Sequence, residues 1–232
     1  SMREDGLSPP DSGAAESVLA RDMDAVEATM IVTFREVLSS LPRFGISGGE
    51  RVVVYGAGPV GLSFVKFMKR RGCTVISVEV TKEKADRAKA FGADYAIDST
   101  QTEVVPFVRA LFPDGVEAVI DAVGVNSLIN QAMELIANHG KICSYGISPK
   151  LNMNIDWSRA PYNWSVNFVQ FPEKAEEAAM HQEVMEMIAQ GDLVPRDFIS
   201  LVLPLQEIQT AFDLVEQRKT DLKTVIVFNA MA

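Results

Sequence analysis

The residues best suited to chemistry form a glycine-rich turn, Gly56-Ala57-Gly58-Pro59-Val60-Gly61, inside the stretch "RVVVYGAGPVGLSF". The pattern G-x-G-x-x-G follows an apolar run typical of a buried strand and precedes a helical pattern. In that setting Gly56 allows a tight turn, Gly58 lets the backbone approach a pyrophosphate, and Gly61 lets the helix pack closely on the strand. The helix start then offers free N–H groups to phosphate oxygens. Pro59 costs little there, because its missing N–H would have no helical partner.

An acid in the next strand strengthens this interpretation. The run "TVISVE" ends at Glu79, at the spacing of roughly 20 residues that the motif requires. A carboxylate there accepts hydrogen bonds from the ribose hydroxyls and repels a 2′-phosphate, so the sequence predicts NAD rather than NADP. Methyltransferases that bind S-adenosylmethionine also combine a glycine-rich turn with an acid. They usually lack the third glycine, however, and carry an acid where this chain has Tyr55.

Strand patterns alternate with helical patterns around this turn. Strands are predicted at 51–55, 74–79, 94–97, 117–121, 140–145 and roughly 164–171, with helices at 59–71, 82–91, 101–111 and 126–138. Such alternation implies right-handed crossovers and a parallel sheet that is covered on both faces. The predicted fold class is therefore α/β, a Rossmann-type, doubly wound, parallel six-stranded sheet.

The flanking sequence predicts further elements. Apolar residues at helical spacing predict a helix from Asp24 to Leu41 that ends before Pro42. After the sheet we expect a helix at 173–190, a proline-punctuated link "DLVPRDFISLVLP", a helix from Pro204 to Gln217 and a closing strand "TVIVF". The predicted organisation is a flexible arm at 1–22, a dinucleotide-binding domain with its preceding helix at 23–172, and a partial second domain at 173–232.

Composition narrows the class of partner. The formal net charge of −9 and the pI near 4.8 argue against non-specific binding to nucleic acid or to anionic lipid. No apolar stretch approaches the ~20 residues that span a bilayer, and the first residues lack the apolar block of a signal peptide. Two cysteines, Cys73 and Cys143, are too few for a disulfide framework and favour a reducing cytoplasm. We therefore expect a small-molecule substrate, no nucleic acid and no membrane.

Longer segments resemble the medium-chain, zinc-type alcohol and polyol dehydrogenase family. The resemblance runs from about Asp24 to Phe228 and rests on "GGERVVVYGAGPVGLSFVKFMKRRG", "VEVTKEKADRAKAFGADYAID", "VEAVIDAVG", "HGKICSYGI", "MIAQGDLVPRDFIS" and "PLQEIQTAFDLVEQRKTDLKTVIVF". It implies hydride transfer between nicotinamide and a secondary alcohol or polyol. It also implies a homodimer through the edge strand at 163–171 and a C-terminal segment that returns to a catalytic domain. The N-terminal part of that domain has no counterpart in these residues.

The resemblance also implies cofactor contacts, position by position. Gly56, Gly58, Pro59, Val60 and Gly61 match the pyrophosphate turn, Glu79 the ribose acid, Lys84 a basic residue beside it, Ala122, Val123 and Gly124 the segment beside the ribose and nicotinamide, Tyr145, Gly146 and Ile147 the backbone that holds the carboxamide, and Thr33 a nicotinamide-side threonine. Two of these have structural alternatives: Lys84 as an exposed helix lysine, and Thr33 as a helix-packing threonine.

A complete metal site is not predicted in this chain, although zinc is expected for the full-length family. The position four residues before Thr33, where family members often supply a cysteine or acid, is Thr29. Zinc needs thiolate, imidazole or carboxylate ligands, and a neutral threonine offers none of these. His139 is interpreted as a turn residue just before the fifth strand, and His181 as a solvated helix residue. Catalytic residues are therefore not assigned.

Three functions stay open. The preferred one is the NAD-binding part of a dehydrogenase that is inactive by itself. The alternatives are a non-catalytic NAD(H)-binding module and a zinc-independent reductase that resembles quinone oxidoreductases. If a catalytic domain belongs beside this chain, apolar surface should be exposed on the helix at 24–41 and on the tail after residue 190.

Overall fold

The computed structural model describes residues 19, 23–150, 152–217 and 219–228, and the chain divides into two compact units. One unit is Ser40–Phe171, and the other joins Ser1–Ser39 to Pro172–Ala232. Each unit has its own sheet, six-stranded in the first and two-stranded in the second. The predicted arm at 1–22 lies outside the described residues, apart from Leu19.

The six-stranded sheet is parallel throughout, in the order β3-β2-β1-β4-β5-β6. Its strands are β1 Arg51–Tyr55, β2 Thr74–Glu79, β3 Tyr95–Asp98, β4 Val116–Asp121, β5 Ile136–Ser144 and β6 Trp164–Phe168. The chain starts in the middle, winds outward to β3, and then crosses back to β4 on the other side of β1. This arrangement confirms the predicted α/β, doubly wound fold. It also places the topological switch point between β1 and β4, where ligands bind in such sheets.

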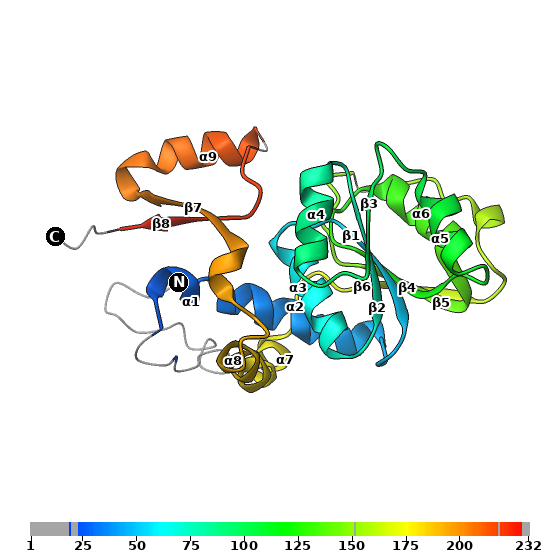
Figure 1. Cartoon of the computed structure of the whole chain (residues 1–232), viewed down its shortest axis with the longest axis horizontal. Helices are drawn as coiled ribbons and strands as arrows, with labels where there is room; N and C mark the ends of the chain where they lie inside the picture. The colour runs from blue at the N-terminus through cyan, green and yellow to red at the C-terminus, as the bar shows by residue number, and fades with distance from the viewer. Residues whose placement is uncertain (1–18, 20–22, 151, 218, 229–232) are drawn as a thin grey trace. The chain divides into compact units, whose positions relative to one another are not determined.

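Helices cover both faces of this sheet (Figure 1). They are α3 Pro59–Arg70, α4 Lys82–Ala90, α5 Val104–Leu111 and α6 Asn126–Leu135. Right-handed crossovers put α3 and α4 on one face and α5 and α6 on the other. A buried core joins α5 and α6 to the central strands and includes Val53, Ile76, Val108, Val119 and Met133. Because both faces are covered, β1 and β4 are almost wholly apolar and buried, which is why they are recognisable in the sequence.

The fifth strand differs from its predicted bounds. It begins at Ile136 rather than 140, so α6 ends at Leu135 and not at 138. The pairing with β4 shifts register between Val116 and Ala118, and the extra β5 residues bulge at that point. His139 lies in the bulge with a φ of 65°, inside the strand rather than in a turn before it. Bulges of this kind depend on strand pairing, which a local pattern does not encode.

In the second unit, the predicted N-terminal helix is two helices, α1 Ala25–Ala28 and α2 Met30–Phe44, whose last residues belong to the six-stranded unit. The Asp24 side chain caps α1, and the hydroxyl of Thr29 bonds the Val26 carbonyl at 2.6 Å where α1 ends. The prediction that the helix ends before Pro42 is wrong. Pro42 lies in the last turn of α2, where one lost N–H bond is tolerated, and Gly45 closes the helix at a φ of 63°.

The C-terminal elements also depart from their predicted bounds. The helix expected at 173–190 is interrupted, and the proline-punctuated link contains a strand that the sequence analysis did not identify. The elements are α7 Lys174–Ala179, α8 His181–Ala189, η2 Pro195–Phe198, β7 Ile199–Pro204, η3 Leu205–Glu207, α9 Ile208–Glu216 and β8 Lys223–Val227. Pro204 ends β7 and does not start the last helix. β7 pairs in parallel with β8, so its partner lies about one helix away in sequence and gives no local signal.

Apolar side chains of the second unit are mostly buried on α2 and exposed on the C-terminal tail. The apolar residues Met30, Phe34 and Val37 of α2 are fully buried, whereas Val32 is 53% exposed, so the expectation of apolar surface on that helix is met only at Val32. Phe34 packs edge-on against Phe198 with ring centroids 4.8 Å apart. The tail meets the expectation, because Ile208, Phe212, Val215 and Phe228 are exposed. Within the described part of the chain, no helix is long and apolar enough to cross a membrane.

Candidate functional site

The glycine turn joins β1 to α3 with the geometry that the motif requires. Gly56 has a φ of 98°, which favours glycine, and its N–H donates to the Val78 carbonyl at 3.0 Å. A Cβ on Gly61 would overlap the carbonyl oxygen of Gly56, so only glycine lets α3 start this close to β1. Gly58 is different, because a Cβ there would meet nothing within 4 Å. The space beside Gly58 is therefore open to a ligand.

The start of α3 has no side-chain cap. Gly58 is the N-cap residue with an extended backbone, and Pro59 occupies the first turn. The N–H groups of that turn have no helical carbonyl to bond, and they carry the positive end of the helix dipole. Together with the open space beside Gly58, this geometry suits the pyrophosphate of a dinucleotide. Val60 lies in the same first turn.

Glu79 is bonded directly to the glycine turn. It is the last residue of β2 and is only 7% exposed. Its Oε1 accepts a hydrogen bond from the N–H of Ala57, and its Oε2 accepts one from the N–H of Val80 at 3.2 Å. The acid and the turn, separate in the sequence, thus form one site. Lys84 is half-buried in the first turns of α4, where its backbone N–H bonds the Thr81 hydroxyl at 3.3 Å.

A second acid, which the sequence analysis did not select, organises the segment after β4. Asp121 ends β4 and is 3% exposed, and its Oδ1 accepts the N–H groups of Val123 and Gly124, each at 2.9 Å. Burial raises the pKa of Asp121, and these two N–H bonds oppose that rise. The available signal was an acid that ends the apolar run "VEAVID". Many acids at strand ends are simply solvated, so the signal was not specific.

The segments after β4 and β5 fit together at the same edge of the sheet. A Cβ on Gly146 would overlap the backbone N of Gly124, and Gly124 itself has a φ of 81°. The ring of Tyr145 packs edge-on against Phe64 of α3, with centroids 5.2 Å apart. These contacts bring together the residues after β1, β2, β4 and β5 that the sequence analysis assigned to the cofactor, Ala122 and Ile147 among them.

Apolar side chains remain exposed along this edge. Val123 is 47% exposed and Ile147 is 59% exposed, and Val80 and Val125 are also exposed. Pockets for cofactors combine such apolar surface with a few fixed polar groups, here the turn and the Glu79 carboxylate. This combination suits a nucleotide cofactor.

Thr33 lies on α2 in the second unit and is 9% exposed. Its assignment to the nicotinamide side stays a prediction.

The described residues do not fit a zinc site. They contain no group of three or more His, Cys, Asp or Glu side chains that could hold a metal ion. Thr29 donates its hydroxyl to its own helix, and Cys73 and Cys143 are both buried. Burial raises the pKa of the Cys143 thiol, which opposes formation of the thiolate that binds zinc.

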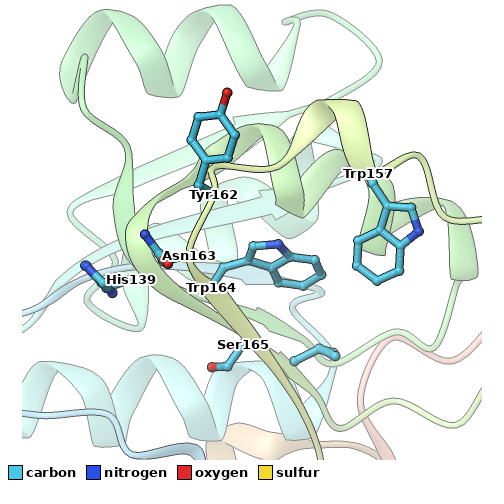
Figure 2. A pocket seen from close by; sticks show the side chains of 7 residues that line it. His139, Trp157, Tyr162, Asn163, Trp164 and Ser165 are labelled. Carbon is cyan, nitrogen blue, oxygen red and sulfur yellow. The ribbon is translucent and has the colours of Figure 1, made fainter.

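A cavity of about 550 Å³ opens beside β6, the terminal strand of the six-stranded sheet, away from the glycine turn. It is lined by His139, Trp157, Tyr162, Asn163, Trp164, Ser165 and Val166. The rings of Trp157 and Trp164 are 5.8 Å apart. Figure 2 shows the Trp164 ring extending from its strand toward Trp157, with His139 on the opposite side of the strand in this view. The cavity contains none of the predicted cofactor residues.

Comparisons with known proteins place the chain in a family. The family described as "Zinc-binding dehydrogenase" matches residues 59–189, more than half of the chain. D-arabitol-phosphate dehydrogenase of Enterococcus avium is 25% identical over 197 residues, which cover 78% of this chain and 51% of that protein. (R,R)-butanediol dehydrogenase of Neisseria gonorrhoeae is 25% identical over 193 residues, 79% of this chain and 52% of that protein. The chain thus spans about half the length of these curated relatives.

The fold has close counterparts among solved structures. Alcohol dehydrogenase TADH from Thermus sp. ATN1 superimposes with a TM-score of 0.79 at 22% identity, covering 91% of this chain and 60% of that one. At this identity the likeness establishes the fold, and the match to residues 59–189 establishes the relationship. The chain therefore belongs to the zinc-binding dehydrogenase family, of the medium-chain alcohol dehydrogenase type.

Proposed function

We propose that this chain is the NAD(H)-binding portion of an alcohol or polyol dehydrogenase, which transfers hydride between nicotinamide and a secondary alcohol or polyol. The observation that carries the proposal is the bond between Glu79 and Ala57, which sets a buried carboxylate against a pyrophosphate-type glycine turn. The family match and the names of the relatives, which include a butanediol and an arabitol-phosphate dehydrogenase, support the reaction class.

The bound cofactor supplies the hydride chemistry, and the residues of this chain hold and orient it. The first turn of α3 and the backbone at Gly58 receive the pyrophosphate. Glu79 accepts the adenosine ribose hydroxyls and excludes a 2′-phosphate, which favours NAD over NADP. Lys84 lies on the ribose side, and the segments 122–124 and 145–147 hold the nicotinamide end. Thr33 is proposed to contact the nicotinamide side.

We propose further that the chain by itself holds the cofactor without oxidising an alcohol. Zinc would be expected for the complete family member, yet the described residues offer no suitable set of ligands, so no step is assigned to a metal. The lack of a zinc-ligand set among the described residues also favours a second candidate, a non-catalytic NAD(H)-binding module. Turnover by the chain with added zinc would exclude that module.

The second unit is proposed to be part of a larger catalytic domain. A two-stranded sheet is marginal alone, and parallel strands are normally buried on both faces. The β7–β8 sheet instead leaves an apolar cavity of about 190 Å³ on its α9 side, lined by Ile208, Ala211, Phe212, Val215, Thr224 and Ile226. This surface supports the proposal that 173–232 is a return segment, beside a proposed arm at 1–22 and a cofactor domain at 23–172, although the compact units group residues up to Ser39 with the return segment.

A homodimer through β6 is the proposed assembly. β6 is a terminal strand of the six-stranded sheet, so one side of its backbone has no strand partner within that sheet. Phe168 is 67% exposed and Val166 is 40% exposed. An exposed edge with apolar side chains is a template for pairing with a second copy.

The two free, buried cysteines support a reducing compartment, and we propose the cytoplasm.

Titration with the four nicotinamide dinucleotides tests the proposed function. NADH and NADPH are followed by their fluorescence, and NAD and NADP by calorimetry. We expect NAD(H) to bind more tightly than NADP(H), with no oxidation of butanediol or of polyols, with or without added zinc. Absence of NAD(H) binding would refute the central proposal.

A further inference from the structure

Asp121 connects the segments that follow two neighbouring strands, β4 and β5. Its Oδ1 accepts the N–H groups of Val123 and Gly124 at 2.9 Å each, while its backbone carbonyl accepts those of Tyr145 at 3.0 Å and Gly146 at 2.8 Å. One residue thus receives four hydrogen bonds from two loops. The side chain sets the path of the loop after β4, and the main chain fixes the loop after β5 beside it.

The two loops meet without side chains between them. A Cβ on Gly146 would overlap the backbone N of Gly124, and a Cβ on Gly124 would overlap the carbonyl oxygen of Ile147. The loop after β4 also touches the glycine turn, because a Cβ on Gly56 would lie 2.9 Å from Cγ2 of Val123. With backbones this close, a change in the path of 122–124 must displace 145–147 as well.

We propose that Asp121 is a positioning residue for the nicotinamide half of the cofactor. This inference rests on the proposed function, which assigns the loops 122–124 and 145–147 to the nicotinamide end. Asp121 is 3% exposed and lies beneath the two loops, so it acts through their backbone and does not contact the cofactor. The turn at Gly56–Gly61 and Glu79 do not use its carboxylate, so the adenosine and pyrophosphate half should bind without it.

The experiment compares two ligands on matched variants. NADH occupies both halves of the proposed site, whereas ADP occupies only the adenosine and pyrophosphate half. In Asp121→Ala, loss of two hydrogen bonds should weaken NADH binding about tenfold and change ADP binding less than about twofold. Asp121→Asn should bind NADH like the unaltered protein, because its amide oxygen can accept the same two N–H groups.

Two further variants keep the test decisive. Gly124→Ala leaves Asp121 in place but drives the loops apart, and it should show the same selective loss of NADH binding. It replaces Asp121→Ala as the test if that variant does not fold. Asp156→Ala is the control, because its Oδ1 likewise caps a backbone N–H, that of Ser158 at 3.1 Å, on an exposed loop. It should leave both ligands unaffected.

The outcomes separate the two proposals. Equal losses of NADH and ADP in Asp121→Ala, or a loss in Asp121→Asn as large as in Asp121→Ala, would overturn the positioning role while the proposed function stands. If the unaltered protein binds neither NADH nor ADP, the proposed function fails, and this inference fails with it.

Discussion

The carboxylate of Glu79 accepts a hydrogen bond from the backbone N–H of Ala57, so the acid at the end of β2 is tied to the glycine turn after β1. This bond fixes the acid beside the turn. A carboxylate offers about four acceptor sites, so Glu79 can keep this bond and still receive ribose hydroxyls. The bond orients the acid beside the turn proposed to hold a dinucleotide.

Replacement of Glu79 tests the choice of cofactor. Glu79→Gln retains an oxygen for the Ala57 N–H but loses the charge that repels a 2′-phosphate. We expect the ratio of NADPH to NADH affinity to rise about tenfold, because a hydrogen bond to a charged group is lost and a repulsion is removed. Fluorescence titration measures both affinities. Glu83→Gln, an exposed acid in the first turn of α4, is the control, and an unchanged ratio in Glu79→Gln would refute the assignment.

Two glycines of the turn, Gly58 and Gly61, should respond differently to alanine. Gly61→Ala places a methyl group on the Gly56 carbonyl and should lower the free energy of unfolding by about 1–3 kcal/mol. Gly58→Ala meets nothing within 4 Å, so its stability in urea should be close to that of the unaltered protein. Its NADH affinity should nevertheless fall, because the methyl group occupies space proposed for the pyrophosphate. A Gly58→Ala variant that binds NADH normally would contradict that proposal.

A charge on the edge strand should prevent dimer formation. Val166→Lys places an ammonium group in the middle of β6, and lysine on an edge strand opposes pairing with a second strand. Light scattering at micromolar concentration should give a dimer mass for the unaltered protein and a monomer mass for the variant. Val32→Lys, at an exposed valine on α2, should remain dimeric. A monomer mass for the unaltered protein would exclude the proposed assembly under these conditions.

Stability should depend on pH through Glu36 of the second unit. Burial and the neighbouring Glu177 raise the pKa of Glu36, and Lys223 opposes this only in part. Because the folded-state pKa lies above the unfolded value, the contribution of Glu36 to stability is full at low pH and is lost as pH rises through the folded pKa. Glu36→Gln should therefore be more stable than the unaltered protein at pH 7, by about 1 kcal/mol or less, and equally stable near pH 3.

Urea unfolding across this pH range measures the effect. Glu216→Gln, at the exposed end of α9, is the matched control. A gain for Glu36→Gln that is the same at pH 3 and pH 7 would show that ionisation is not its cause.

Local sequence was sufficient for the elements whose signals are contained within a few residues. β1, the glycine turn and the start of α3 were predicted nearly to the residue, because an apolar strand, three glycines and a proline each impose a backbone constraint locally. β7 was missed because its parallel partner β8 comes only after α9. The end of α2 was predicted too early, since Pro42 is tolerated where Gly45 completes the helix.

The proposed cofactor site at the carboxyl ends of β1, β2, β4 and β5 was likewise predicted in part from the sequence. The types and spacing of Gly56, Gly58, Gly61 and Glu79 indicated a dinucleotide site without any structure. The role of Asp121 required the tertiary structure, because its partners come from two loops that are separate in sequence and meet only when β4 and β5 pair.

The sequence by itself determined the alternation of strands and helices in the six-stranded sheet, the turn and the acid, because these depend on residue type and on spacing along the chain. Which loops touch, which acid organises them and which apolar faces stay exposed were decided only by tertiary structure. Those properties arise from strand pairing and burial between distant segments, and no local pattern carries that information.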